Sequence, residues 1–223
     1  MFNLLFISIF IIGTTITIYI VLLFQDVRIE AFSYAKESTP SYIYDKDDFV
    51  VKELNRKYKL NVTYDELPTQ FILALICAED LKFYSHKGVD VSRLFGAFLN
   101  NLKEGELSQG ASTLTQQLIK NTHLSNEKTI ERKIKEIILA LKLEQKMSKE
   151  DIITAYSNLI LFDGITPGVN NASNRFFGKN IWEVNVVEAA SLAALVKSPT
   201  IYNPLKYPEK NKEKKKYDLK NNE

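Results

Sequence analysis

The stretch Ser125–Lys146 reads SNEKTIERKIKEIILALKLEQK and carries the strongest periodic pattern in the chain. Its apolar residues recur every three or four positions, as they do on one face of an amphipathic helix. The residues on this face are Ile130, Ile134, Ile137, Ile138 and Leu141. The pattern predicts a long helix that packs one side against the core of a helical domain.

Cap signals and apolar spacing predict further helices on both sides of this stretch. Pro68 fits the first position of a helix that runs into Glu79, and Asp90 can cap the helix after it. Ser148 and Asn185 each precede an acidic residue three positions later, which is typical of a helix start. The predicted helices are 68–79, 90–102, 112–121, 125–146, 148–160 and 186–197. We therefore expect an all-α fold class.

The first 25 residues predict a membrane anchor. Residues 1–25 contain no charged side chain, and Asp26 is the first. About 23 helical residues span about 35 Å, which exceeds the ~30 Å hydrocarbon core of a bilayer. A cleaved signal peptide is the alternative, but it would have a basic start and a small-residue cleavage site. No Lys or Arg precedes the apolar run, so an uncleaved N-terminal transmembrane helix is expected.

The remaining chain divides by composition into three parts. Residues 26–65 are mixed and polar with short β-prone pieces, and we expect a stalk. The helical pattern defines a domain over 66–205, and the lysine-rich stretch 206–223 is expected to be a solvated tail. The formal net charge of +2 is too small to indicate a nucleic-acid partner. One cysteine and two histidines leave little material for a zinc site.

Three short strings carry groups suited to chemistry. The first, AEDLKFYSHKG at 78–88, places Glu79 at the end of an apolar helix, where burial would make a carboxylate a stronger base. The second, QGASTLTQQLIKN at 109–121, sets hydroxyls and amides at a helix start, where free N–H groups bind phosphate or sugar oxygens. The third, ERKIKE at 131–136, places Arg132 and Lys133 within one turn of Glu136. Each string has an ordinary alternative: a solvated acid, a polar helix cap and surface ion pairs, respectively.

Taken together, these strings resemble the glycosyltransferase family 51 domain, which occurs in monofunctional peptidoglycan transglycosylases and in class A penicillin-binding proteins. The resemblance covers residues 65–208 and implies a lysozyme-like, two-lobed helical domain. The matching positions are Glu79, Asp80, Phe83, His86, Gly88, Gly110–Gln117, Lys120, Asn121, Arg132, Lys133, Glu136, Glu188–Ala190 and Lys197–Pro204. Between 152 and 179 the chain departs from the family pattern at Ser157, Leu161 and Asp163.

The resemblance implies an enzyme of peptidoglycan biosynthesis, and so of cell wall biogenesis and cell shape. It would polymerise lipid II onto a polyprenyl-linked glycan chain, forming β-1,4 bonds with inversion and releasing polyprenyl pyrophosphate. The implied location is the bacterial inner (plasma) membrane, with a single transmembrane pass and the catalytic domain on the periplasmic, extracytoplasmic side. The implied partners are these lipid substrates and the membrane, and the resemblance leaves open other cell-wall synthesis proteins.

The matching positions take their roles from the family. Glu79 would be the catalytic base on the acceptor 4-hydroxyl. Glu136, the second catalytic acid, would orient the cations, and a divalent cation (Mg²⁺ or Mn²⁺) held by Glu136 is left open. The residues implied to bind substrate or pyrophosphate are Ser112, Gln116, Gln117, Lys120, Arg132 and Lys133. The implied supporting residues are Asp80, Phe83, His86, Gly88 and Glu188, although Glu188 could equally be a capping-box acid.

Two other functions remain open at the level of the sequence. A peptidoglycan hydrolase would also use a buried Glu to protonate a glycosidic bond, but the Arg132–Lys133 pair and the predicted anchor favour pyrophosphate chemistry. A catalytically impaired lipid II-binding or scaffold protein is suggested by the departures near Ser157 and by the short C-terminal part. The presence of both Glu79 and Glu136 favours the active enzyme.

Overall fold

The computed structural model describes residues 41–54, 61–104, 112–125, 127, 129–162, 167–197, 201–204 and 206–213, and scattered positions between 7 and 32. Most of these residues are helical, which confirms the all-α class for the domain and is consistent with a lysozyme-like helical domain. The helices are α2 (Thr69–Glu79), α3 (Val91–Glu104), α4 (Leu114–His123), α5 (Ile130–Lys146), α6 (Lys149–Leu159), α7 (Val169–Phe177) and α8 (Val186–Lys197). Two short 3-10 helices, η1 (Tyr64–Glu66) and η2 (Ile181–Glu183), and two strands, β1 (Ser41–Tyr44) and β2 (Val50–Leu54), complete the described elements.

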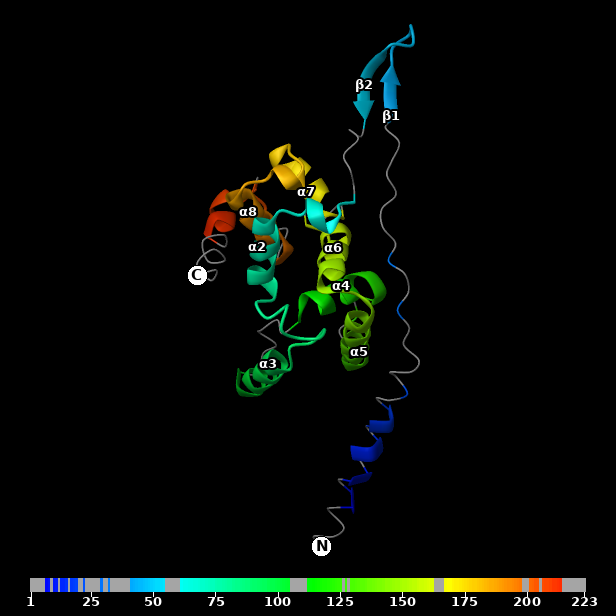
Figure 1. Cartoon of the computed structure of the whole chain (residues 1–223), viewed down its shortest axis with the longest axis vertical. Coiled ribbons are helices and arrows are strands. Elements are labelled where there is room, and N and C mark those ends of the chain that lie inside the picture. The colour runs from blue at the N-terminus through cyan, green and yellow to red at the C-terminus, as the bar shows by residue number, and fades with distance from the viewer. Residues whose placement is uncertain are drawn as a thin grey trace.

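Helices that are far apart in the chain meet in the core of the domain (Figure 1). α8 lies along α2, where the small side chains of Ala74 and Ala190 allow close packing. α4 packs against both α5 and α6. Phe71 of α2 and Tyr156 of α6 both contact the Phe162 ring, with ring centroids 6.0 and 6.4 Å apart. This core fixes the end of α2 relative to α4 and α6, and the predicted site lies at that junction.

Side-chain caps decide where the helices begin. Thr113 and Thr129 accept hydrogen bonds from backbone N–H groups in the first turns of α4 and α5. α5 therefore begins at Ile130 and not near Ser125, because the Thr129 hydroxyl satisfies the free backbone N–H of Arg132. At the start of α6, Ser148 and Asp151 form a capping box, as the sequence predicts. α7 was not among the predicted helices, because its Asn-rich sequence directly follows Pro167 and Gly168, two residues that interrupt helices.

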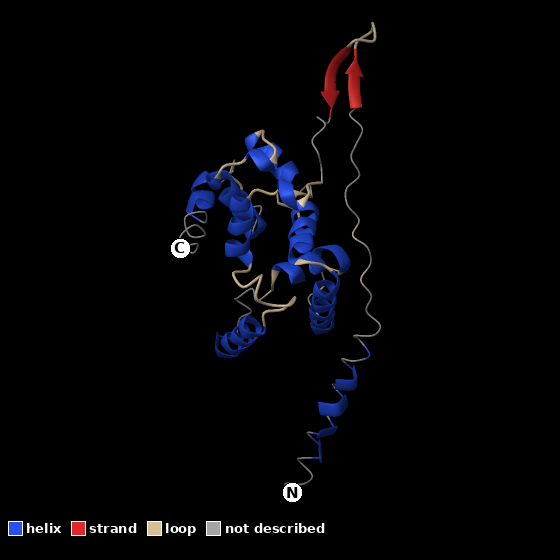
Figure 2. Ribbon diagram, viewed as in Figure 1, coloured by secondary structure: helices blue, strands red, loops and turns tan. Residues whose placement is uncertain are grey.

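The predicted stalk contains a β-hairpin, which departs from a purely helical chain. β1 and β2 pair antiparallel, with Ser41 opposite Leu54. The turn between them is stabilised by Asp45, whose carboxylate accepts hydrogen bonds from the backbone N–H groups of Asp47 and Phe49 at 2.8 and 3.0 Å. Figures 1 and 2 show that the hairpin projects away from the helical body. The hairpin therefore belongs to the stalk and does not contribute to the core.

The predicted anchor lies partly outside the described residues. The described positions between Ile7 and Leu22 have helical backbone and exposed side chains. Among all described residues, no helix is both long enough and apolar enough to cross a bilayer. Further along the chain, Ile29 and Phe32 pack against the domain core, and the Phe32 ring meets the His123 ring edge to face at 5.3 Å. The first part of the stalk therefore contacts the domain at the end of α4.

The described beginning of the predicted tail, residues 206–213, is exposed to solvent except at Asn211. Residues 208–213 are helical, and Asn211 is buried. The Asn211 amide donates to the backbone carbonyls of Tyr202 at 2.8 Å and of Ser191 in α8 at 3.4 Å. One polar side chain therefore holds this segment against α8. Residues 214–223 lie outside the described residues.

Candidate active site

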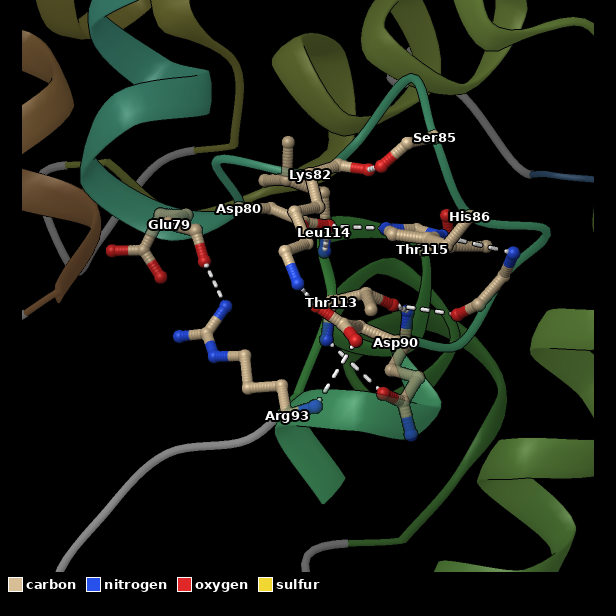
Figure 3. Close-up of polar contacts among 12 residues, drawn as sticks. Glu79, Asp80, Lys82, Ser85, His86, Asp90, Arg93, Thr113, Leu114 and Thr115 are labelled. Atoms are coloured by element: carbon tan, nitrogen blue, oxygen red, sulfur yellow. Dashed lines mark hydrogen bonds and ion pairs between the residues drawn. The ribbon is translucent and has the colours of Figure 1, made fainter. Parts of the chain in front are cut away.

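The predicted base is the last residue of α2, where the chain turns into a loop. Glu79 is half-buried, and its neighbour Asp80 is buried. Figure 3 shows that the two side chains point away from each other, so these adjacent acids serve different parts of the fold. The Arg93 guanidinium, from the first turn of α3, donates to the backbone carbonyl of Glu79 at 2.9 Å. This contact ties the end of α2 to α3.

Asp80 holds the loop after α2 to the start of α4. Its Oδ2 accepts hydrogen bonds from the backbone N–H of Leu114 and from Nε2 of His86, both at 2.9 Å. Nδ1 of His86 accepts from the backbone N–H of Gly88, which assigns the ring proton to Nε2, facing Asp80. The start of α4 also favours a negative charge because of the helix dipole. Through these contacts Asp80 and His86 fix the loop that begins at Glu79.

Gly88 and Phe83 fix the same loop by packing. Gly88 has a φ of +91°, and a Cβ at this position would lie 2.5 Å from the backbone oxygen of Ala140 in α5. The Gly88 carbonyl accepts a hydrogen bond from the Thr113 hydroxyl at 2.7 Å. Phe83 is fully buried and lies edge to face with the His86 ring at 6.0 Å. The loop therefore requires glycine at 88 both for its backbone angle and for its contact with α5.

Gln117 in α4 links the Glu79 carboxylate to α6. Its Nε2 donates to Oε2 of Glu79 at 2.7 Å, and its Oε1 accepts from the hydroxyl of Tyr156 at 2.9 Å. Burial, together with the charge of Glu79, raises the pKa of the Tyr156 phenol well above its ordinary value. The phenol therefore keeps its proton. Tyr156 lies within the helix predicted over 148–160, and no signal in the sequence marked its polar partner.

Glu136 in α5 is the centre of a second cluster. One carboxylate oxygen accepts from Nη1 of Arg132 at 2.6 Å, and the other contacts Nζ of Lys133 and accepts from Nε2 of Gln116 at 3.3 Å. The Lys133 ammonium also donates to the Ser112 hydroxyl at 2.8 Å. The Glu136 side chain is 1% exposed, whereas those of Arg132 and Lys133 are 16% and 32% exposed. A buried acid thus holds two cations that remain accessible to an anion.

α4 brings the two clusters together at its first turn. Gln116 binds Glu136 and Gln117 binds Glu79, and the two glutamines are neighbours in the chain. Through its two glutamines, α4 connects a carboxylate that can accept a proton with a cationic pair that can stabilise a leaving anion. These are the parts that a transfer reaction with a phosphate leaving group requires.

The two carboxylate oxygens of Glu136 do not favour a metal at this position. Each oxygen is already in contact with a cationic side chain, Arg132 or Lys133. Among the described residues, no three His, Cys, Asp or Glu side chains gather at one point that could hold a metal ion. Magnesium and manganese usually take several oxygen ligands, and this cluster lacks them. The divalent cation stays a prediction from the resemblance.

Lys120 and Glu188 are the two predicted site residues outside the contacts described so far. Lys120 is exposed in the last turn of α4. Glu188 forms a capping box with Asn185 at the start of α8, and its carboxylate binds the Lys179 ammonium at 2.8 Å. The hydrogen bond from Lys179 is the main cause that lowers the pKa of Glu188. These contacts favour the structural alternative for Glu188, that of a capping acid.

Glu144 and Lys149 belong to the network around the loop, and neither was predicted from the sequence. The Glu144 carboxylate, with its side chain 4% exposed, pairs with the Lys149 ammonium at 2.7 Å and lies 3.8 Å from Nδ1 of His86. It also accepts a hydrogen bond from the Thr115 hydroxyl. The Lys149 ammonium lies 4.2 Å from the centroid of the Phe83 ring. The one available signal was an acid beside Leu143, on the buried side of the strongest amphipathic helix.

The altered stretch after α6 is described in part. Ser157 is buried, and Asn158 binds both the backbone N–H and the carbonyl of Val62, each at 2.9 Å. Asn158 therefore joins α6 to the segment that leads into the domain. Leu161 forms an isolated bridge with Pro167, and residues 163–166, which include Asp163, lie outside the described residues.

Comparison with known proteins places this geometry in a family. The family model described as transglycosylase matches residues 47–223. The chain is 46% identical over 180 residues to penicillin-binding protein 1A of Clostridium perfringens, an alignment that covers 78% of this chain and 26% of that relative. It is 40% identical over 179 residues to penicillin-binding protein 1A/1B of Bacillus subtilis, which covers 79% and 20% of the two chains. For penicillin-binding protein 1A of Aquifex aeolicus the identity is 38% over 180 residues, with 81% and 25% covered.

The chain spans about a quarter of the length of these relatives. The family match nevertheless includes every helix of the described domain, and it includes both predicted acids, Glu79 and Glu136. A match over most of the chain, together with relatives at this level of identity, establishes the family. The chain belongs to the transglycosylase family, the glycosyltransferase family 51 that its motifs resemble.

Proposed function

We propose that this chain is a peptidoglycan glycosyltransferase that polymerises lipid II into β-1,4 glycan strands and releases polyprenyl pyrophosphate. The proposed domain has the two-lobed, lysozyme-like arrangement, and residues 1–25 anchor it by a single pass to the bacterial plasma membrane on the extracytoplasmic side. The observation that carries the proposal is the junction at α4, where Gln117 binds the Glu79 carboxylate and Gln116 binds the acid of the Arg132–Lys133 cluster.

In the proposed reaction, Glu79 accepts the proton of the acceptor sugar 4-hydroxyl. The hydroxyl oxygen forms a bond to the anomeric carbon of the donor, and the bond from that carbon to the pyrophosphate breaks. An α-linked donor gives a β-linked product because the attack inverts the anomeric centre. The pyrophosphate leaves with the bonding electron pair, and its charge is stabilised by Arg132 and Lys133. The buried Glu136 keeps those two cations in place.

The substitution Glu79→Gln tests the proposal. The amide keeps the size of the side chain and one acceptor oxygen for Gln117 but cannot act as the base, so we expect lipid II polymerisation to fall by about 1,000-fold or more. The measurement is the yield of glycan strands from labelled lipid II, separated on a gel, with thermal unfolding as the check of the fold. Glu127→Gln, at an exposed position between α4 and α5, is the matched control and should leave the rate unchanged.

Three results would contradict the proposed function. An active Glu79→Gln protein would remove the base from the mechanism. A wild-type protein that binds lipid II without forming glycan strands would be a binding or scaffold member of the family. Cleavage of finished peptidoglycan without polymerisation of lipid II would instead indicate a hydrolase.

A further inference from the structure

We propose that Tyr156 is a positioning residue that fixes the orientation of the Gln117 amide and thereby keeps the Glu79 carboxylate ionised between turnovers. The inference rests on the proposed function, in which Glu79 is the base. It adds a residue from α6 to a site that the sequence motifs place on α2, α4 and α5. Tyr156 touches neither substrate nor reacting atoms in this account, and its effect passes through Gln117.

The geometry is a chain of two hydrogen bonds that crosses three helices. The Tyr156 hydroxyl donates to Oε1 of Gln117 at 2.9 Å, and Nε2 of Gln117 donates to Oε2 of Glu79 at 2.7 Å. Tyr156 is fully buried, and its ring is held edge to face against Phe162. The hydroxyl is therefore placed by the core and has little freedom to turn toward another partner.

The chemistry of the three groups fixes the direction of both bonds. An ionised carboxylate can only accept, so Gln117 has to present its NH₂ group to Glu79. The amide oxygen then faces Tyr156, and the phenol has to donate. Because burial raises the pKa of this phenol, its proton is retained throughout the working pH range. The reversed amide would set two acceptors, the Gln117 oxygen and the Glu79 carboxylate, against each other.

The charged side chains near the end of α2 also have partners of their own. From α3, the Arg93 guanidinium donates to the Glu79 backbone carbonyl, and Lys82 lies beside Ser92 and Asp90. Next to Glu79 in the chain, the Asp80 carboxylate faces away, toward the start of α4 and His86. α8 meets α2 through alanine side chains, and Lys120 at the far end of α4 is exposed. Gln117, from α4, donates a hydrogen bond to Oε2 of the Glu79 carboxylate.

The arrangement has a consequence for catalysis. Hydrogen bonding from Gln117 stabilises the charged form of Glu79 relative to the protonated form. Without the Tyr156 hydroxyl, the amide could turn its oxygen toward Glu79 and accept a hydrogen bond from the protonated acid. The protonated acid would then be relatively more stable, and a higher pH would be needed to ionise the base. The acidic limb of the pH–rate profile should therefore move to higher pH.

The substitution Tyr156→Phe tests this inference, because it removes one buried oxygen and keeps the ring. The rate of lipid II polymerisation is measured as a function of pH, with thermal unfolding measured in parallel. We expect the acidic limb to move up by roughly one pH unit, with the rate on the alkaline plateau within about threefold of wild type. Tyr84→Phe is the matched control: it removes a phenol oxygen whose partner is Tyr64, and its profile should superimpose on that of wild type.

A second substitution predicts a shift in the opposite direction. Replacement of Tyr156 by 3-fluorotyrosine keeps the hydroxyl and makes it a stronger donor, so the acidic limb should move to lower pH. A Tyr156→Phe profile that superimposes on wild type would overturn the inference. So would an equal loss of rate at every pH, since that is the result expected for a residue that serves packing alone. Activity of Glu79→Gln would instead contradict the proposed function, so the two failures are distinguishable.

Discussion

Gln116 and Gln117 are adjacent in the chain, yet they bind two different carboxylates. At the first turn of a helix, successive side chains point in directions about 100° apart, so neighbouring residues can serve separate clusters. Gln116 donates a hydrogen bond to the buried carboxylate of Glu136, and Gln117 donates one to the half-buried carboxylate of Glu79. The pair therefore sets the spacing between the proposed base and the proposed anion site. A single helix start carries this function because Thr113 caps it and holds its first turn in place.

Lys133 and Lys135 offer a direct test of the cation cluster at the scale of one residue. Lys133 contacts the buried Glu136 and the Ser112 hydroxyl, whereas Lys135, two positions on, pairs with the exposed Glu131 at 2.7 Å. We expect Lys133→Met to lower kcat by about 100-fold or more, because it removes charge that stabilises the departing pyrophosphate. Lys135→Met should change kcat less than about twofold, since exposed pairs contribute little. Equal effects of the two substitutions in the gel assay would reject the leaving-group role of Lys133.

The loop between α2 and α3 connects Glu79 with the start of α4 and with α5. One side of it carries Asp80 and His86 against the start of α4, and the other carries Gly88 against α5. Glu144 supports the loop from within, since its carboxylate lies near the His86 ring and pairs with Lys149. The loop is therefore held by buried polar contacts, and such contacts are costly to leave unpaired. These contacts hold the loop in place directly after Glu79, the last residue of α2.

A comparison of Gly88 with Gly178 distinguishes two costs of replacing a glycine: the strain of a positive φ angle and the steric clash of an added Cβ. Both have positive φ angles, +91° and +66°, but a Cβ on Gly88 would lie 2.5 Å from the Ala140 backbone oxygen, and one on Gly178 would meet nothing within 4 Å. We expect Gly178→Ala to cost about 1 kcal/mol from the backbone angle alone. Gly88→Ala should cost more than about 2 kcal/mol and lower Tm by at least about 5 °C, because α5 or the loop has to move. Thermal unfolding measures both, and equal Tm values would show that the contact with α5 relaxes freely.

The sequence predicted those helices whose starts are decided locally. Asp90, Ser148 and Asn185 each cap the helix that the pattern indicated, because a side-chain cap depends on residues two or three positions apart. The residues of the two clusters were also found, since family motifs mark them. Contacts between elements were not found: nothing in the periodicity of α6 indicates that the Tyr156 hydroxyl meets Gln117.

α7 shows why local patterns failed for one helix. Its residues include Asn170, Asn171 and Asn174, which are poor helix formers in isolation. In the fold, the buried Asn170 side chain accepts a hydrogen bond from the backbone N–H of Ile181 at 2.8 Å. Asn171 donates to the carbonyl of Pro167 at 2.6 Å, in the segment before the helix. Tertiary contacts thus stabilise a helix that propensity alone disfavours, and a single sequence does not display them.

At the scale of the whole molecule, α3 and the described N-terminal positions lie toward the same end in Figure 1. α3 exposes large apolar side chains there: Val91 is 73% and Phe95 63% exposed. Apolar surface of this kind favours contact with another apolar surface over contact with water. Since both proposed substrates are lipids, these exposed residues support a domain that works beside a bilayer. The hairpin projects at the opposite end, away from that surface.

Deletion of residues 1–25 tests whether the N-terminal segment acts by confining the enzyme to the plane of its substrates. In vesicles that contain lipid II, an anchored enzyme searches a surface, so its effective concentration near the substrate is high. We expect the deletion to lower the initial rate of polymerisation in vesicles by at least about tenfold. In detergent micelles, where the substrate is dispersed, the two proteins should have equal rates, because the deletion leaves Glu79 and the cation cluster untouched. A rate that falls equally in vesicles and in micelles would mean that the segment supports the fold of the domain, and equal rates in vesicles would reject confinement as its function.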